Sequence, residues 1–182
     1  VKLIHYNLSG RRDQLSIYLI NGYTQNISVN YNNPYSNKKL TKGFSIGGGY
    51  LQKRELPIKT DNEDSLIFYP SNPVIKSKNE FLYKNWFVHA GYTIRRGFFT
   101  KHIFTASYNY IKIPDSVITT PYNKNYFKDS VSSKGIIDFI YKLQYANVNN
   151  GSYPLTGKTW FASLQKRGLG FTGGINMLQL EA

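Results

Sequence analysis

Side chains capable of metal binding are few in this chain and widely scattered. The 182 residues include 3 histidines and no cysteine, which excludes disulfides, thiolate chemistry and cysteine-ligated metals. A metal site needs convergent ligands at a workable spacing, and His5, His89 and His102 show none. We therefore predict no metal site, and we expect the histidines to be packed or to face a polar interior.

The other candidate groups fit structural roles better than catalysis. Ser132, Ser133 and Asp138 do not form a triad, because no histidine is placed to activate a serine. The run Gly47–Gly49 is not followed by Lys-Ser or Lys-Thr and opens no helix, so bending of a strand or close backbone approach explains it better than phosphate binding. We expect solvated loop charges at Glu55, Asp61, Glu63 and Asp64. We predict no catalytic residue and no cofactor, and the chain is not expected to be an enzyme.

The formal net charge of +13 indicates anionic partners but does not select one. Nucleic-acid binders tend to gather positive charge on one face. Here the basic residues are spread through turns, loops and strand ends: Lys38, Lys39, Lys42, Lys53, Arg54, Arg95, Arg96, Lys101, Lys166 and Arg167. We therefore expect no nucleic-acid partner. Basic side chains that point inward could line a polar lumen, and those that point outward could contact anionic lipopolysaccharide.

The elements that position these charges are β-strands. No segment approaches the roughly 20 apolar residues of a membrane helix. Alternation of apolar and polar residues instead predicts nine strands, each complete one near or above the about 9–11 residues that a tilted barrel strand needs. Their predicted ranges are 1–8, 12–21, 25–33, 43–56, 81–95, 101–113, 134–147, 158–168 and 174–182.

The two faces of these strands differ sharply in polarity. In the third, Ile27, Val29 and Tyr31 alternate with polar residues. The fifth places Leu82, Trp86, Val88, Ala90, Tyr92 and Ile94 on one face and Tyr83, Asn85, His89, Gly91 and Thr93 on the other. The same separation holds in the seventh (Ile137, Phe139, Tyr141, Leu143 and Tyr145 against Asp138, Lys142 and Gln144) and in the eighth (Trp160, Ala162 and Leu164 against Thr159, Ser163 and Gln165). Such a repeat is typical of a membrane barrel, although a soluble sheet with one wet face also shows it.

The connections favour the membrane interpretation. Segments 34–42, 96–100 and 148–157 are short and rich in turn residues, whereas 57–80 and 114–133 are long, polar and irregular. Up-and-down strands place the long and short connections at opposite ends, as in outer-membrane barrels. The sequence therefore predicts an all-β, antiparallel transmembrane β-barrel.

Charges and aromatic residues on the apolar face support this prediction. Arg54, Lys84, Lys112 and Lys166 fall at the long-loop ends of their strands, where a long side chain can reach the headgroups, and none falls at the midplane. Two aromatic belts are expected. Tyr50, Tyr83, Trp86 and Tyr110 form the long-loop belt, and Tyr31, Tyr92, Tyr153 and Trp160 form the short-turn belt.

Two hairpins carry a resemblance to a known family. The string LQYANVNNGSYPLTGKTWFASL, with Tyr153, Pro154 and Gly157, resembles a periplasmic hairpin of the BamA/TamA outer-membrane protein family (the bacterial surface antigen family). Upstream, VNYNNPYSNKKLTKGFSIGGGYLQ resembles an earlier hairpin, in which Asn33, Pro34 and Tyr35 close a strand. The family's later loop motif is not matched, since Arg96-Gly97-Phe98 falls in a short turn. The resemblance covers nearly all of the 182 residues.

The resemblance implies that the chain is a fragment of one barrel domain and covers about nine of its about sixteen strands. The family's upstream soluble repeats and the remaining barrel strands would lie outside this fragment. It implies insertion of proteins into the bacterial outer membrane, or their passage across it. The expected partners are outer-membrane lipid and lipopolysaccharide, client outer-membrane or secreted proteins, and accessory assembly lipoproteins. A channel or single-partner secretion pore, the barrel of a patatin-like lipase, and a soluble carbohydrate-binding sandwich remain alternatives.

Overall fold

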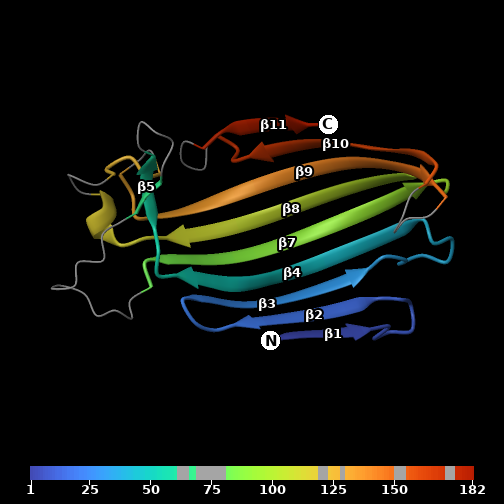
Figure 1. Cartoon of the computed structure of the whole chain (residues 1–182), viewed down its shortest axis with the longest axis horizontal. Coiled ribbons are helices and arrows are strands. Elements are labelled where there is room, and N and C mark those ends of the chain that lie inside the picture. Colours follow the sequence, from blue (N-terminus) through green and yellow to red (C-terminus); the bar gives the residue numbers. More distant parts are fainter. Residues whose placement is uncertain (61–65, 69–80, 119–122, 128–129, 150–154, 171–174) are drawn as a thin grey trace.

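The computed structural model describes the chain except for residues 61–65, 69–80, 119–122, 128–129, 150–154 and 171–174. Nine strands form one antiparallel sheet in which each strand pairs with the next of the nine along the chain. They are β1 (Lys2–Tyr6), β2 (Gln14–Ile20), β3 (Thr24–Asn33), β4 (Lys42–Lys53), β7 (Tyr83–Arg96), β8 (Thr100–Lys112), β9 (Ser133–Val148), β10 (Gly157–Arg167) and β11 (Met177–Glu181). The sheet is open, with β1 and β11 at its two edges (Figure 1).

All nine predicted strands are present, and most boundaries agree to within about three residues. Strict antiparallel order places the connections 54–82 and 113–132 at one end of the sheet, as predicted. We call this the long-loop end. The opposite end, with the connections 7–13, 34–41, 97–99 and 149–156, is the short-turn end (Figure 1).

The long connections are more regular than the sequence suggested. Segment 57–80, predicted to be irregular, contains the paired strands β5 (Pro57–Thr60) and β6 (Leu66–Phe68). Segment 114–133 contains the short 3-10 helix η1 (Asp115–Ile118). These pieces share a buried apolar cluster, the loop core, composed of Leu56, Ile58, Leu82, Ile113, Val117 and Phe127. The expectation that Leu82 lies on the exposed apolar face was therefore wrong, because the side chain is buried in this cluster.

Glycines on one face allow close approach between strands. A Cβ on Gly49 would collide with the carbonyl oxygen of Ile27 and would lie 2.6 Å from the Cβ of Ser28. A Cβ on Gly47 would meet the side chains of Asn30 and His89. The run Gly47–Gly49 thus lies inside β4 and serves strand packing, as the sequence indicated.

Candidate functional surfaces

The sheet exposes its apolar residues and covers its polar ones. On β7, Trp86 and Val88 are 60% and 50% exposed. Asn85, which directly precedes Trp86 and points to the other side of the sheet, is only 8% exposed. The same inversion holds on β3, where Ile27 is exposed and Ser28 is buried. We call the side of Ile27, Trp86 and Val88 the apolar face and the opposite side the polar face. In water this distribution is unfavourable, because each exposed Val or Trp forgoes the free energy of burial.

Charged residues on the apolar face occur only at the ends of strands. The nine strands place six basic residues there, each within two positions of a strand terminus: Lys42, Lys84, Arg96, Lys112, Lys158 and Lys166. Five of these residues also lie near an end of the sheet, whereas Lys166, near the end of the shorter β10, is in register through Phe139 with Ala106, midway along β8. The predicted placement of Lys84, Lys112 and Lys166 toward the long-loop ends of their strands is confirmed, and Lys42, Arg96 and Lys158 lie at the short-turn ends of theirs.

Aromatic side chains form two groups on the apolar face. Trp86 is paired with Tyr50 on one side and Tyr110 on the other, and the Tyr50 and Trp86 ring centroids are 4.3 Å apart. Near the short-turn end, Trp160 stacks on Tyr145 with centroids 5.7 Å apart. Tyr83 lies on the polar-face side and packs against the loop core, so its assignment to the long-loop belt was wrong. Tyr153 lies outside the described residues.

The spacing of these groups can be compared with a membrane. Tyr145 is paired with Thr100, ten positions along β8 from Tyr110. At a rise of about 3.3 Å per residue this is about 33 Å along the strand. A strand tilt of about 40° reduces the height to about 25 Å, which is the height of the apolar band in outer-membrane barrels.

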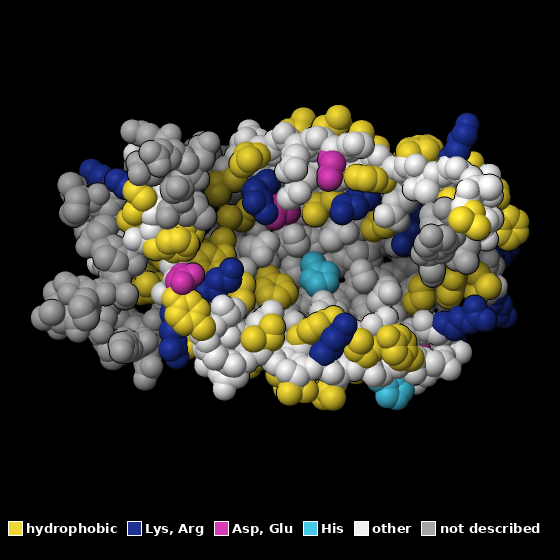
Figure 2. All heavy atoms as spheres, in the orientation of Figure 1, with side chains coloured by type: hydrophobic (Ala, Val, Ile, Leu, Met, Phe, Trp, Pro, Cys, Tyr) yellow, Lys and Arg dark blue, Asp and Glu magenta, His cyan; other side chains and the backbone are white. Residues whose placement is uncertain are grey.

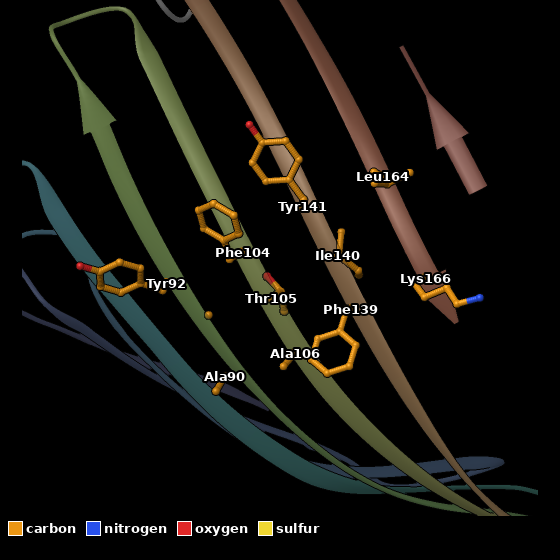
Figure 3. A pocket seen from close by; sticks show the side chains of 11 residues that line it. Ala90, Tyr92, Phe104, Thr105, Ala106, Phe139, Ile140, Tyr141, Leu164 and Lys166 are labelled. Carbon is orange, nitrogen blue, oxygen red and sulfur yellow. The ribbon is translucent and has the colours of Figure 1, made fainter. Parts of the chain in front are cut away.

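A shallow apolar depression of about 480 Å³ crosses the same face between β7 and β10 (Figure 3). Its floor is low where Ala90 and Ala106 are directly paired. Larger side chains surround it, including Phe104, Phe139 and Tyr141. The lining is mostly hydrocarbon, with Lys166 among the lining residues, so the depression suits an aliphatic chain.

The polar face forms a trough. Figure 2 shows a hollow between two raised borders, with a histidine near its centre and Lys and Arg side chains around it. His89 belongs to this face, where it is paired with Ser107 and Gly47. On this face the strands carry seven basic residues and two acidic ones: Lys2, Lys53, Arg95, Lys101, Lys134, Lys142 and Arg167 against Asp138 and Glu181. The trough is therefore polar and net cationic.

Asp138 is the buried acidic group of the trough, at 3% exposure. The Nε of Arg167 donates to its Oδ1 at 3.0 Å, across a directly paired position of β9 and β10. Asp138 therefore has a structural partner in Arg167. His102 lies on the apolar face with its Nδ1 2.9 Å from the Tyr141 hydroxyl, and His5 is exposed on β1.

The other candidate groups remain apart. No group of three or more His, Cys, Asp or Glu side chains comes together among the described residues. No helix in the described part of the chain is long and apolar enough to cross a bilayer. Glu55 is exposed beside β4, while Asp61, Glu63 and Asp64 lie outside the described residues.

Two connections at the short-turn end are held by hydrogen bonds from side chains. In 7–13, the buried Asp13 carboxylate accepts from the backbone N–H of Ser9 at 2.9 Å and from the Tyr31 hydroxyl at 2.9 Å. Burial alone would raise the pKa of Asp13, but these hydrogen bonds outweigh it and lower the pKa below its ordinary value. In 34–41, Asn37 Oδ1 accepts from the backbone N–H groups of Thr41 and Lys42.

Comparison with family models, with curated proteins and with solved structures finds no match to this chain. The fold and the surfaces above therefore carry the functional argument. They define an all-β antiparallel sheet of nine strands with an exposed apolar face and a polar trough.

Proposed function

We propose that the sheet is part of a transmembrane β-barrel in the bacterial outer membrane. The observation that carries this proposal is the inverted burial, with apolar side chains exposed and polar side chains covered. Lipid is the environment in which that arrangement is favourable. The terminal placement of basic residues and the separation of the aromatic groups support the same conclusion. Because open sheet edges are not viable in lipid, β1 and β11 would each need a neighbouring strand in the membrane.

Tryptophan fluorescence tests this placement. The full-length protein is folded into vesicles of phosphatidylcholine brominated at defined acyl depths, and Trp86 and Trp160 are isolated by difference with Trp86→Phe and Trp160→Phe. Both should be quenched most strongly by bromines close to the headgroups, since both belong to interfacial aromatic groups. Quenching at no depth would contradict the proposal.

A matched control uses the residue beside Trp160. Phe161 lies on the polar face, so Phe161→Trp in a Trp86→Phe/Trp160→Phe background leaves one indole, one residue away from position 160 but toward the trough. Its fluorescence should be insensitive to brominated lipid. Equal quenching at positions 160 and 161 would show that the two faces do not differ in lipid contact.

For the biochemical role, we propose insertion of proteins into the outer membrane or their passage across it. The support is the resemblance of the hairpins around Asn33–Pro34–Tyr35 and Tyr153–Pro154 to the BamA/TamA family. Such a barrel would act by offering a sheet edge to a client strand, which pairs with it by β-augmentation. Depletion of the protein followed by quantification of other outer-membrane barrels tests this role. Unchanged barrel levels would rule out general assembly.

A channel is the second candidate, and the cationic trough favours it. A lumen lined by this face would attract anions and lower their barrier to entry. Planar-bilayer recordings of the full-length protein would then show steady conductance with anion selectivity. The absence of conductance under the same conditions would exclude the channel and would leave the proposed assembly role unaffected.

A further inference from the structure

A cavity of about 620 Å³ lies between the two braced connections of the short-turn end. Its lining comes from 7–13 and 34–41 alone: Gly10, Arg11, Arg12, Tyr35, Ser36, Asn37, Lys38 and Leu40. No strand residue lines it, so a ligand would approach from the aqueous side rather than from lipid. None of these residues belongs to a strand of the sheet, although Tyr35 packs against Arg95 at the end of β7.

The cavity concentrates cations that have no partner in the described part of the chain. The side chains of Arg11, Arg12 and Lys38 make no hydrogen bond or ion pair with a described residue. The acidic residue of these two connections, Asp13, is already engaged with Ser9 and Tyr31. The three positive charges are therefore uncompensated around one space.

The walls of the cavity are preformed. Asn7, Arg12 and Leu40 have φ angles of 62°, 59° and 56°, and these are three of the four non-glycine residues with positive φ in the described chain. Such conformations cost free energy and persist only where surrounding contacts enforce them, as they do at binding sites. Here the Arg12 backbone N–H donates to Asn7 Oδ1 at 2.8 Å. On the other wall, Arg95 stacks on Tyr35 at 4.8 Å and donates to the Pro34 carbonyl at 2.7 Å.

The charge of the whole end matches that of the cavity. The connections of the short-turn end contain four basic residues and one acidic residue, whereas those of the long-loop end contain six basic and seven acidic residues. An acidic partner would therefore be drawn to the short-turn end and would gain little at the other.

We propose that this cavity binds an acidic peptide segment of a partner protein. Arginine guanidinium groups match carboxylates in a two-pronged geometry, and Ser36 and Asn37 supply further polar contacts. The volume lies within the usual range of about 300–1,000 Å³ for ligand pockets, which a bare inorganic anion would leave mostly unfilled. Tyr35 and Leu40 provide apolar wall for the aliphatic part of the segment. The site does not depend on the barrel proposal, since it lies wholly in the connections.

Fluorescence anisotropy with the full-length protein in detergent micelles tests the site. The probes are labelled hexaglutamate and, as a neutral control, hexaglutamine. Hexaglutamate should bind and hexaglutamine should not. The double variant Arg12→Gln/Lys38→Gln should raise the Kd for hexaglutamate at least about tenfold, which corresponds to about 1.4 kcal/mol.

The matched control compares the single variant Lys38→Gln with Lys39→Gln, which removes one positive charge from the same connection at a residue that does not line the cavity. Lys39→Gln should change the Kd less than about twofold, because an exposed charge outside the site contributes little. An equal loss in Lys39→Gln would overturn the proposal in favour of non-specific attraction. Displacement of the peptide by millimolar phosphate or by phosphatidylglycerol vesicles would overturn it in favour of a phosphate ligand.

A heat-modifiability gel checks that each variant remains folded. If the double variant fails to fold, the charge-reversing variant Arg11→Glu, exposed and outside the bracing hydrogen bonds, replaces it. Loss of hexaglutamate binding in folded Arg11→Glu supports the site, and unchanged binding contradicts it.

Discussion

Lys84 on β7 and Lys112 on β8 are directly paired on the apolar face, and both side chains are exposed. Like charges at such a pair repel each other, so the sheet alone gains nothing from this arrangement. Both lysines lie at the long-loop end, next to the paired residues Trp86 and Tyr110. An anionic lipid headgroup between the two ammonium groups would reverse the sign of their contribution.

We therefore expect the effect of Lys84→Gln to depend on lipid charge. In zwitterionic vesicles the substitution should stabilise the folded protein by about 0.2–1 kcal/mol, because the repulsion is removed. In vesicles containing lipopolysaccharide it should destabilise by about 1 kcal/mol, because a lysine near an anionic surface is attracted by that amount. Urea unfolding followed by fluorescence measures both. The same sign in both lipids would exclude a bridging headgroup.

Ala106 and Thr105 test which face meets lipid. Ala106 lies on the apolar face midway along β8, and Thr105 is its neighbour on the polar face. Ala106→Arg should lower the free energy of unfolding in a bilayer by about 2–4 kcal/mol, because the charge would lie near the midplane. In Thr105→Arg the new side chain would face the trough, so the free energy of unfolding should not fall by this amount. Urea unfolding in vesicles measures the difference, and equal effects of the two variants would argue against a lipid-facing apolar side.

Gly49 and Gly91 differ in what an added methyl group would meet. At Gly49 the obstacle is the backbone of Ile27 and Ser28, whereas at Gly91 it is the rotatable hydroxyl of Ser45, at 2.5 Å. We expect Gly49→Ala to destabilise by about 1–3 kcal/mol, and Gly91→Ala by clearly less. The free energies of unfolding of the two variants provide the comparison, and a reversed order would mean that close strand approach at Gly49 is unimportant.

The lowered pKa of Asp13 predicts loss of stability in acid. A carboxylate with a lower pKa in the folded state stabilises that state above the unfolded-state pKa of about 3.9, and the contribution disappears as pH falls through the folded-state pKa. The melting temperature of the wild type should therefore fall between pH 6 and pH 3 by more than that of Asp13→Asn. The exposed Asp115→Asn serves as control and should behave like the wild type. If the melting temperatures of the wild type and of Asp13→Asn fell equally with pH, the stabilising role of the Asp13 carboxylate would be contradicted.

The strands and their faces could be predicted because both depend on local alternation. Ile27, Val29 and Tyr31 on β3 already show the period of two that sets which side each residue takes. Closure of the sheet could not be decided in the same way. It depends on strands meeting across the whole molecule, and the structure shows an open sheet.

The loop core and the short-turn cavity lie beyond sequence reasoning for a different reason. Leu56, Val117 and Phe127 come from separate connections without common periodicity, so only their folded positions show that they pack together. Likewise, Arg12 and Lys38 belong to different hairpins, and no spacing rule joins them. The unusual density of basic residues at positions 11–12 and 38–39 was the available signal.

The distance between the two aromatic groups also sets a preference among membranes. A hydrocarbon layer of about 25 Å would match the apolar face, and a thicker one would impose a mismatch penalty of fractions of a kcal/mol per ångström. The bacterial outer membrane is thinner than average. Refolding should accordingly be most complete in short-chain phosphatidylcholines and should decline as acyl length grows, so that bilayer thickness alone would favour one cellular membrane over another.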